Sequence, residues 1–438
     1  MKGVLRSVGP LLLGIGMVLL ASGLFNSFLS LRMGIEAFPP QLIGFVVSAY
    51  FAGFLFGSLW TGAIVAQVGH IRAFAAFAAI LTGSFLFLAL FVSPWAWMAI
   101  RVLSGFAIAG IFVVTESWLN DRADSGNRGS ILSLYMIVNQ LASGLGQQLL
   151  QAGDPAGPDL FLIAGALLSV ALVPVALSPS AGPPPPSRNA LSLLALYRIS
   201  PLGVVGCFAV GLSNAAFYSL APLFGHSLGL SVAAIAQFMT VTILAGMVMQ
   251  WPIGRLSDRR DRRHIIAGVT AGVVVAAAAI AVAGAWSLPL PLLLGLVAVY
   301  GGLSLTVYPL MVAHANDFTG PGQRVAASAG LLLAYGIGAV IGPIVAANLM
   351  GFFGPQALFA YVALIAAGLC AFTVYRIGRR APVPVDARDA FVPVAETTAA
   401  PRPGPGQDAA DVHDEPSGNE RAEAPRSSSG AATGEGGR

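Results

Sequence analysis

Two ionisable side chains lie within an otherwise apolar stretch of the sequence, residues 94–119. On one helix, Arg101 and Glu116 would be about 22 Å apart along the axis and about 60° apart around it, so both could face one cavity. Ionisable groups in apolar spans are costly and are commonly functional. Glu116 could carry a proton, and Arg101 could bind an anionic group or tune a nearby protonation. Alternatively, Glu116 lies close enough to the end of the stretch, beside Trp118, to reach water.

Uncharged polar residues recur at helical spacing in a second apolar stretch, residues 129–151. Gln140, Ser143, Gln147 and Gln151 follow the spacing i, i+3, i+7 and i+11, so they share one face of a helix. Amides left unpaired in hydrocarbon are expensive. The stripe therefore predicts either the lining of a polar cavity, which we favour, or hydrogen bonds to another helix.

Other apolar stretches contribute polar residues that could contact a ligand. Tyr300, Ser304 and Tyr308 form a second stripe, and Asn26 and Asn214 occupy matching positions in two similar segments. The candidate ligand-binding residues are Asn26, Arg101, Gln140, Gln147, Asn214, Tyr300 and Tyr308.

Charged residues gather in a few short connections between the apolar stretches. Asp258 is accompanied by Arg259, Arg262 and Arg263, and this cluster could form a gating contact with the start of the helix near residue 128, because an acid is stabilised at a helix N-terminus. Two Asn-Asp units, each followed by an arginine, could serve the same gate: Asp121 with Arg128, and Asp317 with Arg324. Alternatively, all of these charges only fix topology and loop geometry.

Several classes of chemistry have no matching pattern in the sequence. No glycine-rich phosphate loop ends in Lys-Ser or Lys-Thr, and no metal-ligand spacing or nucleophile elbow appears. Cys207 and Cys370 both lie in apolar runs and suggest no disulfide framework. We therefore expect no catalytic residues, no metal and no cofactor, and not an enzyme.

The composition indicates what must position these residues. Hydrophobic residues make up 56% of the 438 residues and charged residues only 10%, whereas soluble domains carry about 25% charge. Most of the chain must therefore face lipid, which excludes a soluble enzyme and a nucleic-acid-binding protein. Twelve runs are long enough to cross a bilayer: 10–31, 41–65, 72–92, 94–119, 129–151, 159–178, 201–224, 232–254, 265–285, 288–314, 325–349 and 355–376.

The basic residues predict the orientation of these spans. With the N-terminus inside, the cytoplasmic connections receive nearly all arginines that lie outside the spans, and the opposite side receives only Arg32. This distribution fits the positive-inside rule. We therefore expect a multi-pass protein of the plasma membrane with both termini in the cytoplasm.

The spans divide into two similar groups of six. Residues 180–199 contain four consecutive prolines, which favour an extended spacer. We predict a first bundle at 1–179, this cytoplasmic linker at 180–199, a second bundle at 200–378 and a disordered cytoplasmic tail at 379–438. Asp121 and Asp317 lie 196 residues apart, and such a duplication is typical of secondary transporters.

The stretch Gly254–Arg263 resembles the loop motif of the major facilitator superfamily, roughly G-x-x-x-D-R-x-G-R-R, with Asp261 in place of the second glycine. The first copy, residues 62–72, keeps both glycines but lacks the Asp-Arg pair. Arg101 and Gly105 match a second motif of this family, and the run Glu116-Ser117-Trp118-Leu119-Asn120 resembles that of a bacterial subgroup. The resemblance covers about residues 1–380 and implies an all-α fold with alternating access between two six-helix bundles.

We therefore predict a secondary active carrier of a small solute by alternating access, with Glu116 as the residue for proton coupling if protons drive transport. Two other interpretations remain open: a membrane-embedded sensor or scaffold that works through its tail, and a membrane-embedded enzyme or lipid scramblase. The expected partners are a small-molecule substrate, the lipid bilayer and, in the coupled case, protons. We expect no nucleic-acid partner, and we expect a monomer.

Overall fold

The computed structural model describes residues 2–122, 128–177, 192–284, 288–320, 323–379, 381, 383–384, 388 and 391–394. The proline run of the predicted linker and residues 395–438 of the predicted tail lie outside the described residues. The first half contains α1 (Lys2–Ile35), α2 (Pro40–Val68), α3 (His70–Leu90), α4 (Pro94–Arg122), α5 (Arg128–Gly146), the 3-10 helix η1 (Gln147–Ala152) and α6 (Asp159–Ala176).

The second half begins with a short helix inside the predicted linker. This helix is capped by Ser192, whose Oγ accepts a hydrogen bond from the Ala195 N–H at 3.2 Å. The helices of this half are α7 (Leu193–Ile199), α8 (Pro201–Ser227), α9 (Val232–Arg259), α10 (Arg262–Ala283), α11 (Leu290–Asn316), α12 (Arg324–Phe353) and α13 (Ala357–Ile377).

Eleven helices within the described residues are long and apolar enough to cross a membrane. The remaining predicted span, 129–151, is formed by α5 and η1, which follow one another directly at Gly146. The prediction of an all-helical membrane protein with twelve spans in two six-helix bundles is confirmed.

The two halves repeat the same helix contacts. A Cβ atom at Gly105 of α4 would overlap the carbonyl oxygen of Tyr50 in α2. Gly301 of α11 lies 196 residues later and approaches the carbonyl oxygen of Thr242 in α9 in the same way. Only glycine allows backbones to come this close, so these two positions fix equivalent helix pairs in the two halves.

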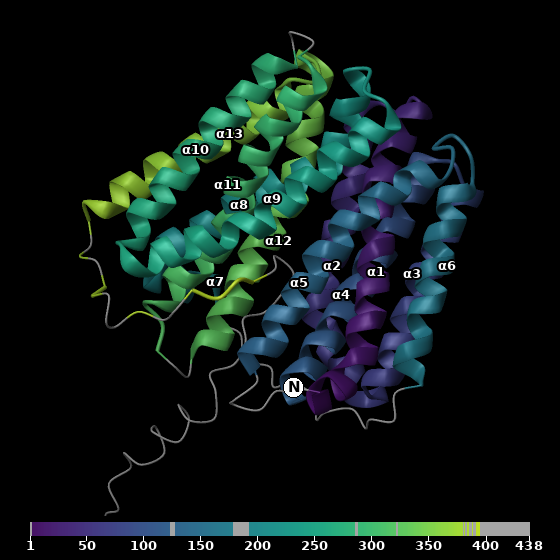
Figure 1. Ribbon diagram of the computed structural model, residues 1–438, viewed down its shortest axis with the longest axis horizontal. Coiled ribbons are helices and arrows are strands. Elements are labelled where there is room, and N and C mark those ends of the chain that lie inside the picture. Colours follow the sequence, from purple (N-terminus) through teal and green to yellow (C-terminus); the bar gives the residue numbers. More distant parts are fainter. Residues whose placement is uncertain are drawn as a thin grey trace, which may run out of the picture.

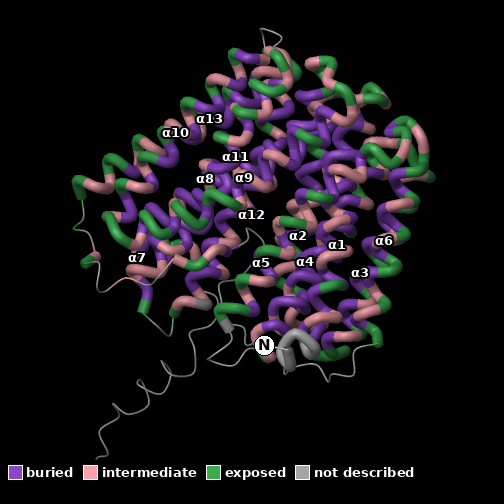
Figure 2. The backbone as a smooth tube through the Cα atoms, in the orientation of Figure 1, coloured by how far each residue is buried: buried purple, intermediate pink, exposed green. Residues whose placement is uncertain are grey.

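The outer surface of the bundle is apolar. Trp60 of α2, Trp251 of α9 and Phe352 of α12 are 64%, 62% and 74% exposed. Figure 2 shows buried positions along the inward sides of the helices and exposed ones along the outer sides and at helix ends. This distribution is what a bilayer requires, because lipid tails solvate apolar side chains as well as a protein core does.

The halves lie side by side (Figure 1). The end that carries the N-terminus and the connections bearing Arg72, Arg122 and Arg259 to Arg263 is called the basic end below. Toward the opposite end, α1 contacts α8 and α2 contacts α12. Gly44 of α2, for example, lies against Ala347 of α12, where a Cβ atom would come within 2.9 Å.

Polar contacts also join the halves between α5 with η1 and α9. The Thr240 Oγ1 donates to the carbonyl oxygen of Gly144 at 2.9 Å, and the Gln148 Nε2 donates to the Thr240 Oγ1 at 2.7 Å. The interface between the halves therefore combines close helix packing with satisfied hydrogen bonds.

Candidate functional site

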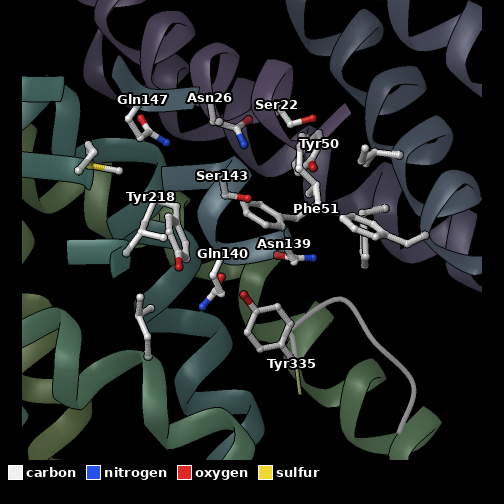
Figure 3. A pocket seen from close by; sticks show the side chains of 18 of the residues that line it. Ser22, Asn26, Tyr50, Phe51, Asn139, Gln140, Ser143, Gln147, Tyr218 and Tyr335 are labelled. Carbon is white, nitrogen blue, oxygen red and sulfur yellow. The ribbon is translucent and has the colours of Figure 1, made fainter. Parts of the chain in front are cut away.

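A cavity of about 180 Å³ lies between the two halves. It is lined by helices of both halves: α1, α2, α4, α5 and η1 from the first, and α8, α9, α11 and α12 from the second. Cavities at the interface of two transporter repeats are where solutes bind in such folds. Figure 3 shows its polar side chains pointing toward a common space.

The first half supplies most of the polar lining. Three of the four residues in the predicted α5 stripe, Gln140, Ser143 and Gln147, line the cavity, as does the predicted Asn26 of α1. The fourth stripe residue, Gln151, is exposed, and its Nε2 donates to the Oε1 of Gln148 at 2.8 Å. The other polar residues on this side are Ser22, Tyr50 and Asn139.

The second half supplies a more aromatic and apolar lining. Its polar members are Tyr218, Gln250 and Tyr335, accompanied by Met239, Ile243 and Leu305. Pockets that combine apolar walls with a few fixed polar groups are typical of small-molecule sites.

Six polar lining residues were not predicted from the sequence: Ser22, Tyr50, Asn139, Tyr218, Gln250 and Tyr335. Asn139 adjoins the predicted Gln140, and Tyr335 lies 196 residues after Asn139, at the equivalent position of the repeat. Comparison of the two halves position by position could have found this pair.

Three predicted contacts of the second half do not line the central cavity. Asn214 is buried within that half, where its Oδ1 accepts a hydrogen bond from the Ser304 Oγ at 3.1 Å. Tyr300 is also buried, with its ring centroid 5.1 Å from that of Phe217. Tyr308 packs edge-on against the lining residue Tyr335, with ring centroids 5.3 Å apart. A role in direct solute binding stays a prediction for these three residues.

Arg101 lies beside the central cavity in a smaller pocket. It is 3% exposed, and its guanidinium carbon lies 4.1 Å from the centroid of the Tyr50 ring. Asn26, Tyr50 and Tyr218 line both the smaller pocket and the central cavity, so the two spaces adjoin. The structure thus places this predicted residue next to Asn26.

Glu116 lies farther along α4, toward the basic end. It is 9% exposed, and the Tyr135 Oη of α5 donates to its Oε1 at 3.4 Å. Glu116 does not line the central cavity. Protonation of this carboxyl group would therefore change the contact between α4 and α5, and it would not change a direct contact with a solute in the cavity.

The α9–α10 corner at the basic end holds a buried ionic network. Arg262, whose side chain is 2% exposed, donates from Nη1 to both carboxylate oxygens of Asp317 at 2.8 Å. Its Nη2 donates to the Oδ1 of Asp258 at 3.0 Å. One guanidinium thus joins the end of α9, the start of α10 and the end of α11. Such charge-assisted bonds fix geometry strongly.

A second contact supports the same corner. The Arg263 Nη2 donates to the Oδ2 of Asp261 at 2.7 Å, and the Arg263 backbone N–H donates to the Oδ1 at 3.0 Å. Partial burial raises the pKa of Asp261, but the hydrogen bonds and charge of Arg263, with a smaller contribution from His264, outweigh burial and hold this pKa below its usual value.

The other predicted gating residues are distributed differently. Arg259 and Asp121 are exposed, and Arg324 begins α12 in a half-buried position. The side chain of Arg128 lies outside the described residues. The predicted contact of Asp258 with the start of α5 therefore stays a prediction. Within the described chain, no group of His, Cys, Asp and Glu side chains is arranged to hold a metal ion.

Residues 11–306 match the model of the Major Facilitator Superfamily, which covers more than half of the chain. The chain belongs to this superfamily. Among its relatives is the uncharacterized MFS-type transporter YcaD of Escherichia fergusonii, 31% identical over 82% of this chain and 93% of that protein. YcaD of Salmonella typhimurium is 30% identical over the same shares.

Solved structures of facilitators share the fold at low sequence identity. A variant of the nucleoside transporter NupG superimposes with a TM-score of 0.72 at 15% identity, covering 85% of this chain and 100% of that one. A bacterial homologue of the human lysosomal transporter Spinster gives 0.70 at 15% identity, with coverage of 88% and 99%. The family model and the YcaD relatives thus confirm the expected membrane transporter of this superfamily, and the solved structures confirm the fold.

At the repeat-related positions of its first half, this facilitator has different residues in place of Asp258 and Arg262. At the repeat-related α2–α3 corner, Ala66 stands 192 residues before Asp258, and His70 stands 192 residues before Arg262. His70 is 2% exposed, and its Nε2 lies 3.0 Å from the Ser117 Oγ. A neutral contact thus replaces the buried salt bridge.

Part of the predicted disordered tail lies against the helices of the facilitator fold. The Phe391 backbone N–H donates to the Asp258 Oδ1 at 2.9 Å, and the Phe391 ring covers Gly254 so closely that a Cβ there would overlap it. Three residues later, Val394 is 7% exposed and lines the central cavity.

Proposed function

We propose that this facilitator is a secondary carrier that binds a small solute in the central cavity and exposes it alternately to the two sides of the membrane. The observation that carries this proposal is the shared lining, because Asn139 and Tyr335 are repeat-related residues of different halves that line one cavity. Movement of one half against the other would open and close such a site without rebuilding either half.

We propose that the basic end faces the cytoplasm. Arg72, Arg122 and Arg259 lie at this end, whereas Arg32 near the end of α1 lies at the other. Basic residues flanking spans stay on the cytoplasmic side. The termini, the linker at 180–199 and the tail would then all be cytoplasmic.

Proton coupling is assigned to Glu116. This carboxyl group is buried between α4 and α5 beside Tyr135, and protonation removes a charge whose burial is costly. Because α4 and α5 both line the cavity, neutralising Glu116 would change the relative stability of two arrangements of these helices.

Counterflow in proteoliposomes tests the carrier. Vesicles containing the full chain are loaded with members of a broad metabolite panel, and exchange for external labelled solute is measured. We expect Gln140→Ala and Asn139→Ala to reduce exchange at least several-fold, because both side chains line the cavity. Gln151→Ala is the matched control, because this residue lies on the same stripe but outside the cavity. Equal effects of the three substitutions would contradict a site at the cavity.

A second measurement tests coupling. Glu116→Gln keeps the size and hydrogen-bonding capacity of the side chain but cannot release a proton. We expect it to abolish transport driven by a pH gradient while sparing exchange, and we expect Glu36→Gln at the opposite end to leave both intact. Unchanged pH-driven transport in Glu116→Gln would remove this residue from the mechanism.

A further inference from the structure

Arg101 is a buried cation for which the described chain provides no counter-charge. Its guanidinium makes no ion pair or hydrogen bond among the described residues, and its Nε is a buried donor without an acceptor. The Tyr50 ring at 4.1 Å is its main electrostatic contact. A buried guanidinium without a carboxylate is costly, so the site is incomplete as it stands.

No carboxylate among the described residues forms an ion pair with Arg101. Glu116 lies on the same helix but about 22 Å farther along its axis. Glu36 already forms an ion pair with Arg32 near the end of α1. Arg101 thus has no ion pair among the described residues, and a bound anion would supply the counter-charge.

The pocket beside Arg101 has room and further donors for an anionic group. Its volume is about 20 Å³, enough for a group only slightly larger than a water molecule. Ser30 lines it with a buried Oγ that has no hydrogen-bond partner in the described chain. Asn26 and Tyr218 connect this pocket with the central cavity, where a larger organic body would fit.

We propose that the solute is an organic anion whose carboxylate binds Arg101 in this side pocket while its remaining atoms occupy the central cavity. The planar guanidinium matches a carboxylate with paired hydrogen bonds, and Ser30 adds another donor. The inference rests on the proposed carrier function and specifies its substrate class. The aromatic residues Tyr50, Phe51 and Tyr218 favour a carboxylate attached to an apolar or aromatic body.

Thermal unfolding of the purified full chain tests this proposal directly. The probes are a panel of aliphatic and aromatic monocarboxylates, including benzoate and hexanoate, each compared with its neutral amide. We expect at least one carboxylate to raise the Tm by a few degrees at saturation and its amide to leave the Tm unchanged. Stabilisation by amides and carboxylates alike, or by no carboxylate of the panel, would overturn the proposal.

Variants separate the anion site from general damage. Arg101→Gln should weaken carboxylate binding about 30-fold or more, and Arg101→Lys should restore part of the affinity because the charge returns. The matched control is Arg255→Gln, because Arg255 also lies over an aromatic ring, that of Trp251 at 3.8 Å, but outside the cavity. If carboxylates stabilise Arg101→Gln as they stabilise the unchanged protein, the proposal is wrong.

The two proposals can fail separately. Counterflow of neutral solutes that survives Arg101→Gln would keep the carrier and overturn the anion site. Carboxylate binding that depends on Arg101, without counterflow of any solute, would keep the anion site and overturn the carrier.

The C-terminal segment carries a second, independent inference. The Arg388 Nη1 donates to the carbonyl oxygen of Arg260 at 2.6 Å, and the Phe391 N–H binds Asp258. Val394 extends from this anchor into the lining of the central cavity. The segment thus engages a carboxylate of the α9–α10 corner and the cavity at the same time.

We infer that Arg388 and residues 391–394 compete with the solute at the basic end of the cavity. While bound, they occupy Asp258 and part of the solute space, so they must leave before the halves close around a solute there. Among the described residues, release breaks the hydrogen bonds of the Phe391 N–H to Asp258, the Arg388 contact and the packing of Phe391 and Val394. A contact set of this size is compatible with a reversible switch.

Maleimide labelling of a cysteine at Ser143, in the full chain with Cys207 and Cys370 replaced by alanine, measures access to the cavity. Phe391→Ala should increase the labelling rate several-fold because it removes the ring that packs on Gly254. Val392→Ala is the control, because this neighbouring side chain is 46% exposed. Equal rates in the two variants would overturn the inference.

Discussion

The two halves of this facilitator share their helix packing but not their chemistry. Gly105 and Gly301 make the same backbone contact in the two halves. Arg101 and Glu116 of α4, however, correspond at the same offset of 196 residues to Val297 and Val312 of α11, both buried and apolar. A close backbone approach tolerates only glycine, so it is the same in both halves. An interior side chain is under no such constraint, so it can be ionisable in one half and apolar in the other.

The α5 stripe shows the same division. Gln140, Ser143 and Gln147 line the cavity, and the positions 196 residues later are Gly336, Ala339 and Pro343. At the basic end the distribution of polar groups is reversed. There the second half holds the ionic network of Arg262, and the first half has His70 at the equivalent position. The first half therefore supplies most of the polar lining of the cavity, and the second half holds the buried ionic network at the basic end.

The largest expected effect comes from breaking the network of the second half. Arg262→Ala leaves the Asp317 side chain, 3% exposed, without its cation, which should cost about 3–5 kcal/mol of stability. Thermal unfolding of the purified protein measures the loss. Arg259→Ala, at an exposed position in the same connection, should have little effect. Similar losses in both variants would show that the network does not stabilise the corner.

The repeat-related asparagines should respond differently to the same substitution. Asn214→Ala removes a buried hydrogen bond to Ser304 and should cost about 1–3 kcal/mol of stability. Asn26→Ala should instead weaken solute binding with little effect on unfolding, because Asn26 lines the cavity. Unfolding and counterflow measured on both variants test the division. If both variants lost stability and solute exchange to the same extent, the proposed difference between the two asparagines would be wrong.

A graft of the ionic network into the first half sharpens the comparison. Ala66→Asp and His70→Arg together recreate the pair beside Asp121, and the two substitutions should be favourably coupled by about 1 kcal/mol in a double-mutant cycle. The gain is limited because Ala66 and Asp121 are both exposed. Unfolding of the single and double variants gives the coupling. Simple additivity would mean that the corners differ in backbone geometry as well as in residue type.

The smallest expected effect concerns Asp261. Because contacts with Arg263 hold its pKa below the usual value in the folded protein, its contribution to stability is present above the unfolded pKa of about 3.8 and is lost as pH falls through the lower folded pKa. The group is partly exposed, so the contribution should stay below about 1 kcal/mol. Asp261→Asn should be less stable than the unchanged protein at neutral pH, and the difference should shrink below about pH 4.

Much of the fold could be predicted because membrane spans are specified locally. Each span must be long, apolar and helical by itself, so the runs in the sequence correspond to the observed helices. Three of the four residues in the polar stripe of α5 and η1 could also be assigned to the cavity, because uncharged amides in an apolar helix need a polar neighbour. The short helix α7 inside the proline-containing linker was not predicted, since seven residues carry too little periodicity.

The sequence by itself determined the twelve spans and the separation of charged connections from apolar helices, because each depends on composition along one segment. It also determined the duplication, because equivalent residues recur at a nearly constant offset. Only the tertiary structure decided that Asn26 faces the cavity while Asn214 is buried against Ser304, and that Phe391 reaches Asp258. Helical periodicity defines which residues share a face, but the neighbour of that face depends on how helices distant in sequence are rotated and packed.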